Sequence, residues 1–252
     1  MKTETKNQII EIIKKNGPIR PFDLTRLLKI SPQAIHKHLR NLVSEGMLEL
    51  KGSPPSTQYR IAGIPDFQSA FDWFRSNKAK VTDHICETRD RFASRLNHFI
   101  SIGAPEKMLP LIISASGEVG NNSFDHNMGQ WKDIPGCWFE IQKTSGKLWV
   151  LIADRGQGIY RSLSQVVTNL DEKSAVQKAF EERLSGRAPE KRGNGLKFVR
   201  KLITENSVSG IACRSGRGFA SYGEFGENCL NVLQSIPNQN FGTVTLMVWG
   251  IK

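Results

Sequence analysis

The sequence predicts an α+β protein with two domains, and three observations support this. The chain has 252 residues, more than a single domain usually holds. Its first 61 residues carry a pattern of three short helices followed by two short strands. Beyond residue 105, amphipathic helices alternate with strongly apolar strands. We therefore expect one domain over residues 1–62, a helical connector over 63–104 and a second domain over 105–252.

Apolar spacing and turn residues predict the three N-terminal helices. The first covers residues 5–15, where isoleucines recur at helical spacing, and a Gly-Pro pair ends it. The second starts at Pro21. The third begins after Ser31, which suits the N-cap position because a proline follows at the first helical position. It ends at Gly46.

Two short strands over residues 47–51 and 58–61 follow the third helix. Three helices and a two-stranded wing, with the stretch 30–50 as its centre, resemble the winged helix-turn-helix family. The resemblance implies that the third helix enters the major groove of DNA and that the wing contacts phosphates. The residues assigned to DNA are Ser31, Gln33, His36, Lys37, Arg40, Lys51 and Arg60.

The charge of the N-terminal domain fits a polyanionic partner. The chain has a formal net charge of +11. Residues 1–61 contain eleven Lys or Arg against five acids, which gives +6 in the first quarter of the chain. DNA is the expected partner. The alternative is a winged helix that serves only to dock a protein partner or to form a homodimer.

The four cysteines and the hydropathy pattern indicate the compartment. The cysteines are far apart and form no zinc-binding or disulfide framework. No segment approaches the roughly 18 apolar residues of a membrane span. The polar start lacks a signal-peptide core. We therefore expect a cytoplasmic protein that binds no membrane.

A predicted helix from about residue 106 carries Glu118, Asn122 and Asp125. Spacings of four and three residues place these side chains on one helix face. An ATP site needs such groups, because a glutamate can orient or deprotonate water and an asparagine can supply an oxygen to Mg²⁺. The same pattern is also typical of a solvated acidic face.

An apolar strand over residues 147–153 ends at Asp154, which is followed by Gly156 and Gly158. The carboxylate can accept the exocyclic amine of adenine. The glycines allow the backbone to approach the base without a Cβ in the way. Such Asp-x-Gly turns are also common at strand ends without any ligand.

A third motif, Arg192-Gly193-Asn194-Gly195-Leu196, opens an amphipathic helix. A glycine-rich entry offers free backbone N–H groups and the positive end of the helix dipole to phosphate. It lacks the Gly-Lys-Ser or Gly-Lys-Thr of a Walker A motif.

In this order the three motifs resemble those of the GHKL superfamily, which includes gyrase, Hsp90, histidine kinases and MutL. The final segment over 242–249 resembles the closing strand of that family, with Thr243 near the adenine. The resemblance covers about residues 105 to 250. It implies an α/β sandwich with a mixed, mostly antiparallel sheet, helices on one face, and ATP under a mobile lid over 160–191.

The resemblance also assigns roles. Glu118 would be the general base and Asn122 the Mg²⁺ ligand, and Asp125 matches the gyrase form of the first motif. Asp154 would accept adenine. The backbone cradle would come from Gly156, Gly158, Gly193 and Gly195, with Leu196 beside it. The basic residues Arg187, Lys191 and Arg192 are candidates for triphosphate contacts or a solvated basic run.

These assignments predict an ATP-binding regulator that couples nucleotide state to DNA and hydrolyses ATP slowly. One alternative is a serine/threonine protein kinase resembling anti-sigma factors, in which Glu118 would activate a protein hydroxyl. Another is a switch that binds ATP without turnover and uses the winged helix for protein docking.

Overall fold

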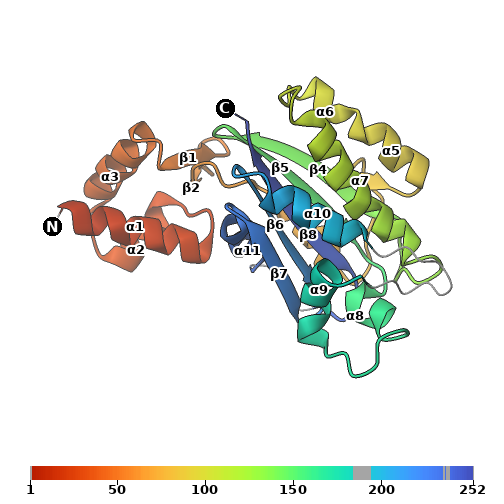
Figure 1. Cartoon of the computed structure of the whole chain (residues 1–252). Coiled ribbons are helices and arrows are strands. Elements are labelled where there is room, and N and C mark those ends of the chain that lie inside the picture. The colour runs from red at the N-terminus through yellow and green to blue at the C-terminus, as the bar shows by residue number, and fades with distance from the viewer. Residues whose placement is uncertain (1, 184–193, 235, 237–238, 252) are drawn as a thin grey trace. The chain divides into compact units, whose positions relative to one another are not determined.

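The computed structural model describes residues 2–183, 194–234, 236 and 239–251. It consists of two compact units, Met1–Ile64 and Pro65–Lys252 (Figure 1). The residues from 65 to 104, which the sequence presented as a connector, belong to the second unit.

The N-terminal unit has the elements and the order that the sequence predicts. Its helices are α1 (Lys2–Asn16), α2 (Pro21–Leu28) and α3 (Pro32–Ser44), and an antiparallel hairpin of β1 (Leu48–Lys51) and β2 (Gln58–Ile61) follows. Ser31 is the N-cap of α3, because its Oγ accepts a hydrogen bond of 3.3 Å from the Ala34 N–H. Gly46 adopts a φ of +70°, which lets the chain leave α3 and enter the hairpin.

One apolar core holds this unit together. Its buried side chains come from all three helices and from the hairpin: Ile9, Ile13, Ile19, Leu24, Ile35, Leu39, Leu42, Leu48 and Tyr59. Ile19 and Tyr59 also exchange two backbone hydrogen bonds, of 3.0 and 2.8 Å, which tie the loop after α1 to the wing. The buried stripe of α3 fixes which of its side chains face solvent.

The second unit is built on one six-stranded sheet. Its strands are β3 (Ile85–Cys86), β4 (Cys137–Thr144), β5 (Lys147–Asp154), β6 (Ser209–Ser215), β7 (Gly218–Gly223) and β8 (Thr243–Gly250). Their order in space is β3-β4-β5-β8-β6-β7, and every pairing is antiparallel. The mixed sheet implied by the resemblance is therefore wrong for the described residues. The strands β5 and β6 run in the same direction, but β8 lies between them.

Helices cover both faces of this sheet. One face packs against α5 (Arg89–Leu96), α6 (His98–Ser101), α7 (Leu109–Asp125), α9 (Glu172–Glu181) and α10 (Gly195–Thr204). The other face packs against α4 (Gln68–Arg75) and α11 (Gly226–Leu233). The expectation of helices on one face is corrected here. The reason is that β5 is apolar on both sides, with Leu148 and Val150 facing one core and Trp149 and Leu151 the other.

The aromatic residues between 65 and 104 complete these two cores. Phe67, Phe71, Trp73 and Phe74 from α4 and its start are buried against the second face, and Phe92 and Phe99 against the first. These side chains are thus internal to the second unit and do not belong to a separate helical connector. Within the described ranges, no helix combines the length and apolarity needed to cross a membrane.

Candidate functional site

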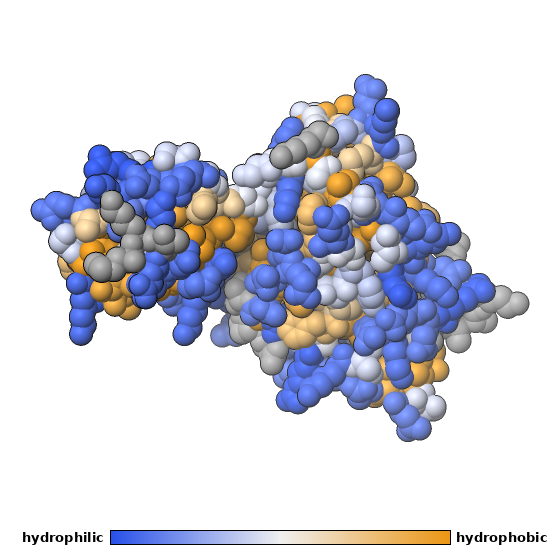
Figure 2. All heavy atoms as spheres, turned by 60° about the vertical axis from the view of Figure 1, so that its left-hand side comes forward, coloured by the Kyte–Doolittle hydropathy of each residue, from blue (hydrophilic) through white to orange (hydrophobic). Residues whose placement is uncertain are grey.

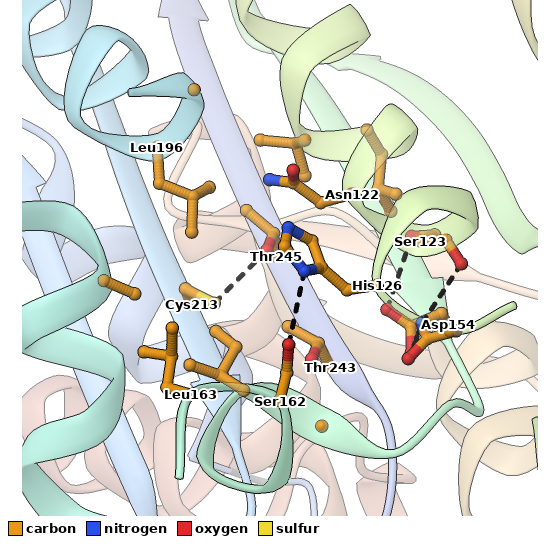
Figure 3. A pocket seen from close by; sticks show the side chains of 17 residues that line it. Asn122, Ser123, His126, Asp154, Ser162, Leu163, Leu196, Cys213, Thr243 and Thr245 are labelled. Carbon is orange, nitrogen blue, oxygen red and sulfur yellow. Dashed lines mark hydrogen bonds between the residues drawn. The ribbon is translucent and has the colours of Figure 1, made fainter. Parts of the chain in front are cut away.

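The first face of the sheet holds a cavity of about 90 Å³ near the ends of β5 and β8 (Figure 3). Its walls come from α7, α8 (Gly158–Leu163), α9, α10 and three strands. Six of the residues that the sequence singled out line it: Asn122, Asp154, Gly158, Gly195, Leu196 and Thr243. Residues from four distant stretches of the chain therefore meet around one cavity.

Asp154 is the buried carboxylate of this cavity, with 5 % of its surface exposed. Its Oδ1 accepts hydrogen bonds from Asn127 Nδ2 at 3.0 Å and from the Gly156 N–H at 2.9 Å, and its Oδ2 accepts from Ser123 Oγ at 3.3 Å. Burial raises the pKa of Asp154 to about 6, although these bonds favour the ionised form. The carboxylate is therefore charged at neutral pH and lies in an apolar setting where a further donor would be held strongly.

Gly156 and Gly158, which follow Asp154, occupy positions that favour glycine for different structural reasons. A Cβ on Gly156 would lie 2.0 Å from Asn127 Cγ, so this glycine makes room for a protein side chain and does not line the cavity. Gly158 does line the cavity and has a φ of +80°. Beyond it, Ser215 Oγ accepts from the Ile159 N–H at 2.9 Å and donates to the Gly242 carbonyl at 2.9 Å. This bridge ties the loop to the start of β8.

Glu118 lies against the N-terminus of α10. The Glu118 carboxylate reaches the backbone of Gly195, because a Cβ there would be only 2.5 Å from Glu118 Oε2. Asn122, one turn further along α7, lines the cavity, whereas Glu118 does not. A carboxylate, an amide and the positive end of a ten-residue helix thus lie next to one another.

Asp125 differs from its expected role, and four other predicted positions cannot be placed. Asp125 forms an ion pair with Arg89 of α5 and is not among the residues that line the cavity. Its charge is therefore used to join α7 to α5. Arg192 and Gly193 lie outside the described residues, as do Arg187 and Lys191.

The cavity also contains polar residues that sequence reasoning missed. Ser123, His126, Asn127, Ser162, Cys213 and Thr245 all line it. His126 Nδ1 is 3.2 Å from Ser162 Oγ, which links the end of α7 to α8. Its position four residues after Asn122 and eight after Glu118 is a signal that could have identified it, because that spacing keeps one helix face. Burial raises the pKa of Cys213 to about 12, so its thiol is neutral.

The segment expected as a lid has two parts. Leu163 and Leu170 form a small separate cluster with Ala175. Val176 and Phe180 from α9 instead belong to the core on the first face of the sheet. Among the described residues of this segment, 160–183, those from α8 to the start of α9 pack in the separate cluster, and residues 184–191 lie outside the described part of the chain.

The N-terminal unit presents a polar helix face. Gln33, His36, Lys37 and Arg40 are exposed on α3, opposite its buried stripe. In Figure 2, hydrophilic side chains cover much of the visible face of this unit, with hydrophobic patches between them. In the wing, Arg60 Nε lies 2.8 Å from Glu49 Oε1, so part of its charge is compensated within the hairpin. Lys51 is half-buried.

Comparison with known families decides the nature of this unit. Residues 2–49 match the family model described as winged helix-turn-helix DNA-binding. The N-terminal unit is a winged helix-turn-helix domain. The match covers the three helices and the start of the first strand of the wing.

Two solved structures give more distant matches. One is the histidine kinase domain of the blue-light activated histidine kinase EL346 from Erythrobacter litoralis, at 16% identity and a TM-score of 0.34, covering 99% of this chain and 94% of that one. The other is IdeR from T. acidophilum, at 15% identity and a TM-score of 0.19, covering 59% of this chain and 88% of that one. Neither score is high enough to support an argument. No curated protein matches the chain.

Proposed function

We propose that this chain is an ATP-binding regulatory protein, with its nucleotide site in the second unit and a DNA-binding winged helix at its N-terminus. One observation carries the proposal: a buried, ionised carboxylate, Asp154, faces a cavity that also contains residues from the N-terminal end of a helix and from an Asn-bearing helix face. Slow ATP hydrolysis is part of the proposal.

The cavity supplies the groups that an adenine ring needs. Val119, Ile152 and Leu196 give it apolar walls, and Asp154 gives it an acceptor. Adenine presents an amino group as donor where guanine presents a carbonyl oxygen. A carboxylate at this place would therefore favour adenine and repel guanine.

The neighbouring groups fit Mg²⁺ and phosphate. The Asn122 amide would supply an oxygen ligand, and oxygen ligands are those that Mg²⁺ prefers. The first turn of α10, at Gly195 and Leu196, would offer backbone N–H groups to phosphate. When bound, Mg²⁺ would offset the repulsion between phosphate and Glu118. Glu118 would then act as the general base.

Nucleotide selectivity tests the proposal directly. We expect Mg-ATP to bind about tenfold to a hundredfold more tightly than Mg-GTP in isothermal titration calorimetry, because a hydrogen bond to a buried charge contributes about 1.5–3 kcal/mol. Equal affinity for the two nucleotides, or no binding of either, would contradict the assignment of Asp154.

The winged helix predicts salt-dependent DNA binding. With a random-sequence duplex as the probe, Lys37→Ala should reduce the slope of log affinity against log salt by about one, because one phosphate contact is lost. Lys14→Ala on α1, where Lys14 pairs with Glu11, is the matched control and should leave the slope unchanged. Equal effects of both variants would mean that the overall positive charge attracts DNA and that α3 makes no specific contact with it. A complete lack of DNA binding would favour the docking alternative.

The pKa of Asp154 predicts that base binding depends on pH. Protonation near pH 6 removes the negative acceptor, so adenosine affinity should be constant above pH 7 and fall about tenfold per unit well below pH 6. Adenosine is the suitable ligand because phosphate groups titrate in the same range.

The same protonation affects folding stability in the opposite direction: it weakens adenosine binding but stabilises the folded protein. Its folded pKa of about 6 lies above the ordinary value of 3.8, so the folded state binds more protons between these values. This contribution to stability therefore rises as the pH falls from 6 to 4, so protonation of Asp154 does not by itself unfold the protein. Asp154→Asn should abolish the pH dependence; an unchanged wild-type affinity from pH 7 to 5 would refute the prediction.

A further inference from the structure

Arg155 follows Asp154 directly, but its side chain points to the opposite face of the sheet. It is fully buried, with 0 % of its surface exposed. Its Nε and Nη2 donate to the two carboxylate oxygens of Asp133, each at 2.7 Å. Burial alone would raise the pKa of Asp133, yet the Arg155 guanidinium and the N–H groups of Ala79 and Ile134 lower it to about 2. The charge of Arg155 is thus closely paired.

The remaining donors of Arg155 hold the end of α4. Nη1 donates to the carbonyl oxygens of Trp73 at 2.8 Å and Phe74 at 2.6 Å, and Nη2 donates to that of Ser76 at 2.9 Å. These carbonyls lie at a helix C-terminus, where intrahelical partners run out. All five N–H groups of the guanidinium are therefore occupied, and three of them fasten the strand end to α4.

The same end of α4 also contacts the start of β8. A Cβ on Gly242 would lie 2.7 Å from Phe74 Cε2 and 2.3 Å from the Asp154 carbonyl oxygen. The Gly242 N–H donates to the Gly156 carbonyl at 2.7 Å. The helix end thus supports, from behind, both segments that bring Asp154 and Thr243 to the cavity.

We propose that Arg155 is a positioning residue for the nucleotide site: by fastening the 154–158 loop to α4, it holds the loop in the conformation that receives the base. Arg155 is not among the residues that line the cavity. The inference rests on the proposed function for the identity of the ligand, but the effect on the loop itself does not depend on it.

Lysine at this position is the informative substitution. Arg155→Lys keeps the positive charge beside Asp133, but an ammonium has three donors and no planar fork, so the five bonds cannot all be made. Arg214→Lys is the matched control. Arg214 is also buried, points to the same face, and donates to the carbonyls of Leu233 and Ile236 at the end of α11.

Two measurements on the full chain test the inference. Hydrogen exchange in the ligand-free protein reports on the loop, because the Gln157 N–H bonds to Asn127 Oδ1 at 3.1 Å and the Gly242 N–H bonds to Gly156. We expect exchange at these two amides to be at least tenfold faster in Arg155→Lys and unchanged in Arg214→Lys. Mg-ATP affinity should fall at least tenfold in the first variant only.

The outcomes separate this inference from the proposed function. Unchanged loop exchange in Arg155→Lys overturns the inference, as does an equal loss of ATP affinity in both variants, which would indicate general destabilisation. If the wild type binds no ATP, the proposed function fails, and loop exchange alone decides the role of Arg155. If Arg155→Lys does not fold, the neutral pair Arg155→Gln with Asp133→Asn replaces it, because that pair leaves no uncompensated charge.

Discussion

Asp154→Asn is expected to weaken Mg-ATP binding by about tenfold to a hundredfold and to remove the preference for ATP over GTP. The reason lies in the hydrogen bonds that surround the carboxylate. Asn127 and Gly156 both donate to Oδ1, so the oxygen of an asparagine would take that place. Its amino group would then replace Oδ2, the side to which Ser123 donates. The asparagine amino group and the adenine amine, both donors, would then face each other, and the hydrogen bond would be lost.

The stability of the protein should change little in this variant. A neutral amide avoids the burial penalty that raises the pKa of Asp154 to about 6. Thermal unfolding measured beside the calorimetry checks this. Asp125→Asn is the matched control, since Asp125 pairs with Arg89 away from the cavity, and its ATP affinity should equal that of the wild type. The assignment of the adenine acceptor fails if Asp154→Asn binds ATP as tightly as the wild type and still prefers it to GTP.

Glu118→Gln is expected to reduce phosphate release from Mg-ATP by about 10² to 10⁴, because general base catalysis contributes that much. The Kd for ATP should change by only a few-fold, since glutamine keeps the size and most of the contacts of the side chain. Glu118 lies against Gly195 at the start of α10, where the phosphates are expected. Release of inorganic phosphate under single-turnover conditions measures the effect.

The control is Glu205→Gln, which removes a carboxylate at the other end of α10, where Glu205 pairs with Lys201 at 3.8 Å. This variant should release phosphate at the wild-type rate. Undiminished release from Glu118→Gln would exclude Glu118 as the base. If the labelled γ-phosphate appears on a protein hydroxyl and none is free, the chain acts as a kinase. If neither product forms, ATP binding serves as a switch.

The sequence alone determined the elements of the N-terminal unit. The isoleucines of α1, the Ser31 cap of α3 and Gly46 at its end are local signals, because helix period and capping depend on residues within a few positions. The same holds for β5 and β8, whose ranges lie within two residues of those predicted, and for the presence of a helix after the Gly193-Asn194-Gly195 motif. Some of the residues that line the cavity could also be predicted from the sequence, among them Asn122, Asp154 and Gly195.

Only the tertiary structure decided how those segments are joined. The insertion of β8 between β5 and β6, the pairing of Asp125 with Arg89, and the place of Asn127 against Gly156 all link residues that are far apart in the sequence. Arg155 is the clearest case: its spacing marks it only as the middle residue of an Asp-x-Gly turn, while its five bonds reach Asp133 and the end of α4. Periodicity records which side of an element is buried, but it carries no information about the partner that buries it.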